Sequence, residues 1–444
     1  MGEYLGLLRR NRNFRYLWWG NVVSLLGDWF NLLASAALVT ELTSSGVAIS
    51  YLFLVRFLPQ FLFSPVAGVI ADRYDRRKIM ILADLLRAVT VLGFLFIRSA
   101  DQLWLFYGLT ATQFMLSALF VPARSAALAN IVEQRDLVTA NALDSFTWST
   151  MFALGAFLGG VIATLFGNQT AFVMDAATFL VSAWLISRIV LPKRDVRRAT
   201  ASGGGWLELS GGLRYLWGIP FLLTISIVKA AGSLVWGAIN VLEVSYADHV
   251  YPLSSTAISN WLSIENGGTA TLGLIYVASG LGTGLGPLLM RRWLGDSTKR
   301  LMAGISVGFF LTATGILALG LVTTLPAFLG ATFMRTFGTG TIWVFSAVLL
   351  QIMVPDQVKG RVFGFEFAAL TLTESLSVFA AGYTQDVFQW SLIRVSSAFG
   401  WLGVLVCVLW MAFFLVTRNR LHRYESTQPI LTVTPPQGDA SRQT

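Results

Sequence analysis

The chain has 444 residues, of which 55% are hydrophobic and only 12% are charged. Soluble domains carry roughly 25% charged residues, so one large water-soluble core is excluded. The apolar runs are continuous rather than alternating at every second residue, which indicates membrane-spanning helices. The formal charge of +9 does not indicate nucleic-acid binding, because the basic residues fall in loops beside apolar runs, as membrane topology requires.

The sequence contains one cysteine, Cys407, and two histidines, His249 and His422, which are far apart along the chain. These are too few for a disulfide framework or for a metal site built from cysteine or histidine. The chain also lacks the Gly-x-x-x-x-Gly-Lys-Ser/Thr loop that cradles a nucleotide. We therefore expect no catalytic residues, no cofactor, no metal and no nucleic-acid partner, and a membrane-embedded enzyme is the least favoured interpretation.

Residues 1–15 place four arginines among leucine and tyrosine residues, a pattern typical of a short interfacial helix on the cytoplasmic face of a membrane. About 20 apolar residues are needed to cross a bilayer as a helix. Twelve runs meet that length, and the expected spans lie at about 16–42, 47–71, 78–98, 102–123, 140–166, 170–190, 218–246, 269–290, 300–321, 325–350, 361–384 and 392–416.

The spans divide into an N-terminal bundle of six, residues 16–190, and a C-terminal bundle of six, residues 218–417. The linker between them, 191–217, has a basic cluster followed by Ala-Ser-Gly-Gly-Gly, as a flexible cytoplasmic connection would. The tail, 418–444, is basic, then rich in serine, threonine, proline and glutamine, and is predicted to be disordered. The basic clusters all fall on one side of a twelve-span chain, and the predicted outer loop 247–268 has no lysine or arginine. This asymmetry predicts an inner-membrane protein with both termini in the cytoplasm.

Several ionisable residues fall inside the apolar runs, where a charge costs about 3 kcal/mol even on the lenient insertion scale, so they need partners or water. They are Asp28, Arg56, Asp84, Arg87, Lys229, Arg335, Glu366 and Glu374. Asp84 and Arg87, three residues apart on one helical face, are expected to pair and to hold helices together. For Asp28 and Glu374, near the middle of their spans, both structural pairing and a role as proton sites in a central cavity stay open. The candidate cavity charges are Arg56, Lys229, Arg335 and Glu366.

Glycines concentrate in two spans, where the absence of side chains lets helices approach closely. Span five contains Gly155, Gly159 and Gly160. Span eight has a glycine at every second position from 280 to 286, a spacing that also permits bending. We favour helix packing over gating as the role of both sets.

A short hydrophilic stretch, Gly68-Val-Ile-Ala-Asp72-Arg73-Tyr-Asp75-Arg76-Arg77-Lys78, follows the second span. Gly68 allows a neighbouring helix to approach, and the basic cluster keeps the loop on the cytoplasmic side. Together with twelve spans and a mid-chain linker, this loop resembles that of the major facilitator superfamily. Four further segments resemble the branch of this superfamily that includes macrolide-efflux and enterobactin-exporter proteins. They are Phe120-Val-Pro-Ala-Arg124, Asn141-Ala-Leu-Asp-Ser145, Phe172-Val-Met-Asp175 and Val354-Pro-Asp356…Gly360-Arg361.

The resemblance implies two pseudo-symmetric six-helix bundles around a central cavity that opens alternately to the two sides of the membrane. It also implies a cytoplasmic gate, in which the Asp72 carboxylate meets the positive end of span eleven near Gly360 and Arg361. The same resemblance implies a gate motif that comprises Gly68, Asp72, Arg73, Arg76, Arg77, Gly360 and Arg361.

Two positions depart from the family pattern. Asp75 stands where the loop of the family has a second glycine, which predicts a tighter or differently shaped turn. Ala156 stands where the antiporter motif of span five has a proline, beside Gly155, and this weakens the inference of export by antiport.

The sequence thus predicts an all-α polytopic membrane protein that exports amphipathic small molecules, of drug or siderophore type, by alternating access in exchange for protons. The alternatives are a facilitator or flippase for a lipid-like substrate without proton antiport, and a membrane sensor that transports nothing. The expected partners are the lipid bilayer, a small-molecule substrate and protons, and the expected state is a monomer.

Overall fold

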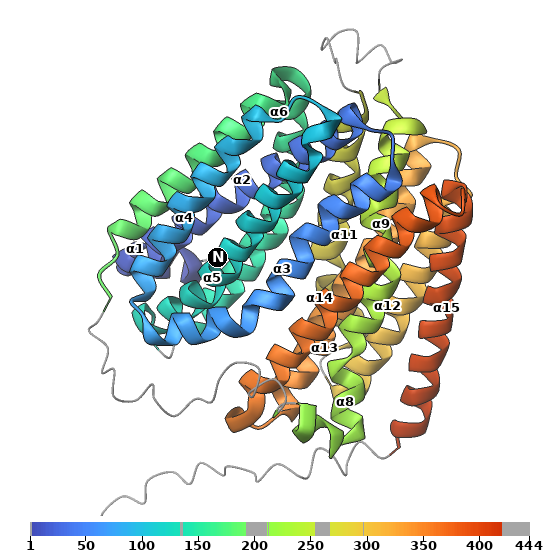
Figure 1. Ribbon diagram of the computed structural model, residues 1–444. Coiled ribbons are helices and arrows are strands. Elements are labelled where there is room, and N and C mark those ends of the chain that lie inside the picture. Colours follow the sequence, from blue (N-terminus) through green and yellow to red (C-terminus); the bar gives the residue numbers. More distant parts are fainter. Residues whose placement is uncertain are drawn as a thin grey trace, which may run out of the picture.

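The computed structural model describes residues 2–133, 136–191, 211, 213–253, 267–295 and 297–419. Among these residues the chain is helical and contains no strand, as predicted (Figure 1). The N-terminal bundle consists of α1 (Gly2–Arg10), α2 (Arg12–Leu42), α3 (Gly46–Arg73), α4 (Arg76–Leu92), α5 (Leu103–Ile131) and α6 (Leu137–Ser187), with short 3₁₀ turns at Gly93–Phe96 and Ala100–Gln102. The C-terminal bundle consists of α8 (Pro220–Ser226), α9 (Val228–His249), α11 (Gly267–Leu294), α12 (Thr298–Leu319), α13 (Leu325–Met353), α14 (Asp356–Asp386) and α15 (Leu392–Thr417). Most of the predicted linker and nearly all of the predicted tail lie outside the described residues.

Eleven helices in the described part of the chain are long and apolar enough to cross a membrane. One of them, α6, has 51 residues and is interrupted at Gly167, whose φ of 81° is not helical. At 1.5 Å per residue its length would be about 77 Å, far more than one crossing of a hydrocarbon core about 30 Å thick requires. The interruption lies between the predicted spans 140–166 and 170–190. The count of twelve crossings stays a prediction.

Polar side chains fix where several of these helices begin. The Asn11 side chain accepts a hydrogen bond from the Phe14 N–H at 2.9 Å and starts α2. Ser45 accepts from the Ala48 N–H at 3.1 Å and starts α3, and Ser391 caps α15 in the same way. These side chains satisfy N–H groups that have no carbonyl partner in the first turn of a helix.

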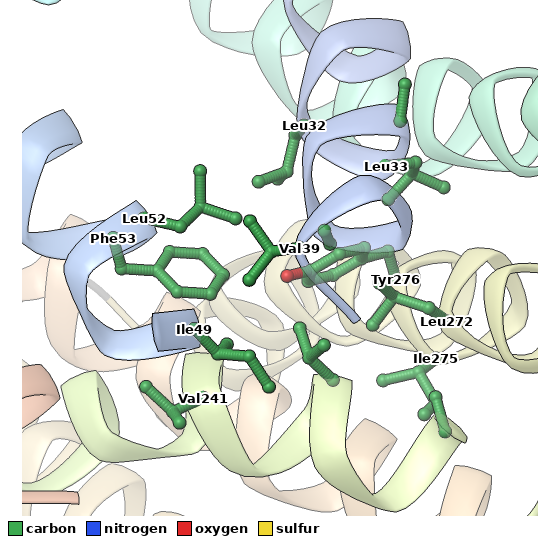
Figure 2. Packing of buried hydrophobic residues seen from close by; sticks show 14 of the residues in the cluster. Leu32, Leu33, Val39, Ile49, Leu52, Phe53, Val241, Leu272, Ile275 and Tyr276 are labelled. Carbon is green, nitrogen blue, oxygen red and sulfur yellow. The ribbon is translucent and has the colours of Figure 1, made fainter. Parts of the chain in front are cut away.

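In the described part of the chain the buried apolar side chains form three clusters, and one of them joins the two bundles. That cluster combines Val39 of α2 and Ile49 of α3 with Val241 of α9 and Leu272 of α11 (Figure 2). It gathers around the end of α2, the start of α3, the end of α9 and the start of α11, which together we call the joined end. In the predicted topology the joined end faces outward.

The other two clusters lie toward the opposite end of the molecule, and each stays within one bundle. One contains Leu7, Phe14 and Met80 of the N-terminal bundle. The other includes Met302 and Phe345 of the C-terminal bundle. The apolar core is therefore continuous between the bundles only toward the joined end, and Figure 1 shows the two bundles inclined to one another.

Candidate functional site

The N-terminal bundle holds a buried charge network centred on Arg87 of α4. The Arg87 Nη2 lies 2.9 Å from the Asp28 Oδ1 on α2, and its Nη1 lies 3.5 Å from the Asp84 Oδ1. The guanidinium also stacks over the Phe179 ring of α6, 4.0 Å from the ring centre. The predicted Asp84–Arg87 pair is confirmed. The partner of Asp28 is also Arg87, which was expected from the sequence to pair with Asp84.

The Asp28 side chain is the accessible member of this network. Its exposed fraction is 27%, while Asp84 is fully buried and the Arg87 side chain is 3% exposed. Asp28 therefore combines a buried cationic partner with partial access to the space around it.

Arg56 of α3 has a different environment. Its Nη1 donates a hydrogen bond of 3.4 Å to the Asn31 Oδ1, and its guanidinium lies 4.5 Å from the ring centre of Phe114. The side chain has no ion pair among the described residues, although the residue is only 8% exposed. Cation–π contact with a ring is worth up to about 2 kcal/mol when the cation is desolvated, which offsets part of its burial cost.

Asp175 of α6 is a fully buried carboxylate that the list of candidate charges missed. Its Oδ1 accepts a hydrogen bond of 3.5 Å from Thr178, and its Oδ2 has no partner among the described atoms. Gly27 of α2 makes room for it, because a Cβ there would lie 2.5 Å from the Asp175 Oδ1. The signal was present in the sequence: an acidic residue inside the predicted span 170–190.

Among the described residues of the C-terminal bundle, two ion pairs are buried, and both include a residue of α9. The Lys229 Nζ lies 3.0 Å from the Glu366 Oε1 on α14, and 4.7 Å from the ring centre of Trp343 on α13. The Arg335 guanidinium of α13 pairs with the Glu243 carboxylate. Each of these charged side chains is at most 7% exposed. Glu243 was also missed from the sequence, although it falls inside the predicted span 218–246.

Glu374 of α14 differs from these acids. It accepts a hydrogen bond of 3.3 Å from the Asn240 side chain, and no ion pair reaches it from the described part of the chain. The residue is half-buried. Among the described residues Glu374 is therefore held by a neutral amide and by no cation.

Aromatic rings bridge the bundles beside Asp28. Trp29 of α2 stacks on Phe152 of α6 with ring centres 4.7 Å apart, and lies 5.7 Å from Tyr276 of α11. The Tyr276 hydroxyl is buried and has no hydrogen-bond partner in the described residues. Trp148 joins the group through Phe152, at 5.4 Å. This aromatic group therefore packs across the contact between the two bundles.

The predicted packing glycines of α6 lie against α2 and α11. A Cβ on Gly155 would meet the Trp29 ring at 2.8 Å, and one on Gly159 would lie 3.1 Å from the Trp29 carbonyl. A Cβ on Gly160 would lie 3.1 Å from the Cα of Gly273 in α11. The last contact joins the two bundles, so this glycine face is part of the joined end.

The arginines of the predicted cytoplasmic gate bind within the N-terminal bundle. The Arg76 Nη1 donates to the Ala126 carbonyl at 2.9 Å, and Arg77 donates to the Ser187 carbonyl. Arg73 is exposed. The surroundings of Gly68 and Gly360 and the side chain of Asp72 lie outside the described part of the structure. The predicted contact of Asp72 with the start of α14 therefore lies outside it too. Arg361 is exposed at that start.

The unusual Asp75 in this loop has a local explanation. Its carboxylate accepts hydrogen bonds from the Arg77 N–H at 2.9 Å and the Lys78 N–H at 3.2 Å, and so caps α4. The backbone at Asp75 has a φ of −64°, a value that any residue adopts. An aspartate at this position therefore starts the next helix directly, where the family pattern has a glycine.

Two other segments that carry the family resemblance meet in the structure. Arg124, at the end of the segment that begins at Phe120, forms an ion pair with Asp144 of α6. Both side chains are largely buried at the predicted cytoplasmic end of α5 and α6. The ion pair therefore connects α5 to α6 and brings two of the family-like segments into contact.

These features define a multi-pass membrane transporter of the major facilitator superfamily, and not an enzyme. Residues 7–439 match the family described as transmembrane secretion effector, and the chain belongs to that family. It is 25% identical to the putative bacilysin exporter BacE of Bacillus subtilis, over 94% of this chain and 97% of that protein. It is 22% identical to macrolide efflux protein A of Streptococcus pyogenes, over 86% of this chain and 92% of that protein.

The fold is also that of solved transporters. The crystal structure of the nucleoside transporter NupG matches with a TM-score of 0.66 at 13% identity, over 93% of this chain and 99% of that chain. At this identity the match shows the arrangement of helices alone. It agrees with the two bundles described above.

Proposed function

We propose that this transporter exports amphipathic small molecules by alternating access and that protons moving inward drive the export. Support for export comes from relatives whose names describe export of bacilysin and efflux of macrolides. The aromatic group beside Asp28 and the apolar helix faces suit a substrate with large apolar parts and few charges. The type of substrate, drug or siderophore, belongs to the proposal.

The proposed topology has twelve crossings in the inner membrane, with both termini in the cytoplasm. We count α6 as two crossings, 137–166 and 168–187, because Gly167 divides it. The basic residues of the loop 73–78 then face the cytoplasm, and the joined end faces outward. In this topology the present conformation is closed to the outside.

The observation that carries proton coupling is the contrast between Glu374 and the other buried acids of the C-terminal bundle. Glu243 and Glu366 each lie beside a cationic side chain, whereas among the described residues Glu374 has only the Asn240 amide. Asp28 is the second proton site that we propose, because it shares Arg87 with Asp84 and stays partly accessible. Each acid would bind a proton in one conformation and release it in the other.

The test uses the full-length protein in proteoliposomes with an imposed proton gradient and a panel of labelled amphipathic compounds. Substrate movement and proton movement are measured together for the parent, Asp28→Asn, Glu374→Gln and the double variant. Asp101→Asn, in an exposed turn outside the charge networks, is the matched control. We expect each of the two acid variants to lose proton-driven substrate movement, and the control to retain it.

The alternatives give different results in the same assay. Unchanged rates and unchanged pH dependence in all three acid variants would contradict the proposed proton sites. Substrate movement without any accompanying proton flux in the parent would identify a facilitator or flippase of a lipid-like compound. Binding without movement of any compound would identify a sensor.

A further inference from the structure

A carboxylate from one bundle binds the start of a helix in the other bundle. Asp386, the last residue of α14, accepts hydrogen bonds from the Gly46 N–H at 2.9 Å and the Val47 N–H at 3.0 Å. It also accepts from the Ser45 hydroxyl. We call these four residues the outer contact: Ser45, Gly46, Val47 and Asp386.

The chemistry of the outer contact favours a charged acceptor. The first N–H groups of a helix have no carbonyl partner within the helix, and the helix dipole makes that end positive. In α3, a helix of 28 residues, the Gly46 and Val47 N–H groups both point to one carboxylate. Hydrogen bonds from backbone N–H groups to an ionised acid are among the stronger hydrogen bonds in proteins.

Glycines bring the two helices close enough for this contact. A Cβ on Gly382 of α14 would collide with the Ser50 Oγ and would lie 2.5 Å from the Gly46 carbonyl oxygen. One turn further in, the rings of Tyr51 and Phe379 lie 6.4 Å apart. The helices α3 and α14 therefore run antiparallel in direct contact at the joined end.

The two helices belong to different bundles and are in contact at the joined end. Residues 46 and 72 of α3 are about 39 Å apart along a helix, so a rocking motion that closes one end of the helix pair opens the other.

From this arrangement we propose that Asp386 closes the outer side of the transporter by binding the N-terminus of α3. In the outward-open state this contact breaks. Asp386 thus biases the equilibrium between inward-open and outward-open states toward the inward-open side. This inference rests on the topology proposed above, which places the joined end outside.

The test measures how easily the joined end opens, and it requires no substrate. Ile49, 1% exposed within the cluster that joins the bundles, is replaced by cysteine, and Cys407, the only native cysteine, by serine. A membrane-impermeant thiol reagent is added to one side of sealed vesicles, and the labelling rate is measured. Asp101→Ala, an exposed acid in the turn before α5, is the control variant.

We expect Asp386→Ala to raise outside labelling of Ile49→Cys by about tenfold, the effect of a helix-terminal carboxylate in a partly buried site. Ser45→Ala should raise it by a smaller factor, because one of the three hydrogen bonds is lost. Asp101→Ala should match the parent.

Contrary results separate the two proposals. If Asp386→Ala, Asp386→Asn and Ser45→Ala, each eluting as a single species in size-exclusion chromatography, all label at the parent rate, Asp386 does not hold this end closed. A rise that occurs only when reagent is added to the cytoplasmic side would support the contact and overturn the proposed topology. Equal effects of Asp386→Ala and Asp101→Ala would also overturn the proposal.

Discussion

Gly280 of α11 lies directly against Ala153 of α6, in the opposite bundle. A Cβ built on Gly280 would be 2.7 Å from the Cα of Ala153 and 2.6 Å from its backbone nitrogen. Backbone atoms cannot move aside as a flexible side chain can. With the Gly160–Gly273 contact nearer the joined end, this contact forms a continuous seam between α6 and α11.

The first prediction concerns this seam. Gly280→Ala should force α6 and α11 apart, and overpacking of this kind costs about 1–3 kcal/mol. The matched control is Gly330→Ala in α13, where nothing lies within 4 Å of the new methyl group. Replacing that glycine should stabilise the helix by up to about 1 kcal/mol. Thermal unfolding of the two purified variants in detergent measures both changes in stability. Equal shifts of the unfolding midpoint in the two variants would show that the seam is not closely packed.

The second prediction concerns Arg87. Arg87→Gln leaves Asp84 and Asp28 without their cation, and removing one partner of a buried pair costs about 3–5 kcal/mol. Asp28→Asn should cost less, because Arg87 keeps Asp84 and because Asp28 is partly exposed. The unfolding midpoints of the two single variants show which of them loses more stability.

A double variant checks the cause of that loss. If the uncompensated Asp84 charge is the main cost, Asp84→Asn/Arg87→Gln should unfold at a higher temperature than Arg87→Gln alone. A double variant that is less stable than the single one would show that lost packing against the Phe179 ring dominates instead.

The sequence predicted the helices well because each crossing depends on local composition. The break at Gly167 falls between two predicted spans, and the polar residues Ser45 and Asp75 directly precede the helices that they cap. These features need only neighbouring residues. Apolar length and short-range hydrogen bonding were therefore sufficient for most of the fold.

The residues that bind these acidic side chains could not all be predicted in the same way. The Asp84–Arg87 pair is three residues apart and was expected, but Asp28 reaches Arg87 across 59 positions of the chain. Asp386 reaches Gly46 across 340 positions. Such contacts depend on how the helices are arranged, and a single sequence contains no direct signal for that arrangement.

The third prediction concerns the Lys229–Glu366 pair of the C-terminal bundle. Lys229→Met leaves a buried Glu366 without a cation and should destabilise the protein strongly, by about 3–5 kcal/mol. Lys229→Met/Glu366→Gln should recover part of that loss, because no charge stays buried. A double-mutant cycle from unfolding midpoints should give a coupling of roughly 0.5–3 kcal/mol, and additive effects would mean that the two side chains do not interact.

The last prediction concerns α1, expected from the sequence as an interfacial segment over residues 1–15. In the structure Leu7 is 1% exposed and packs into the apolar cluster of the N-terminal bundle that contains Phe14 and Met80, and Arg10 pairs with Asp136, the residue before α6. Leu7→Asp should therefore release α1, since a charge replaces a buried apolar side chain. Trypsin should then cleave after Arg10 about tenfold faster in the purified protein. A fall of about 1.4 kcal/mol in the free energy needed to open α1 raises the population of the open, cleavable form about tenfold.

The neighbouring residue supplies the control for α1. Gly6 is exposed, and nothing lies within 4 Å of a side chain built on it, so Gly6→Asp adds the same charge without disturbing a contact. Protein purified in detergent has no bilayer that could hold an interfacial helix. If Leu7→Asp is cleaved fast and Gly6→Asp slowly, packing of α1 against the bundle is therefore what protects the site. Equal cleavage of both variants would instead favour an α1 held by the membrane surface, because only the bilayer would then have restrained it.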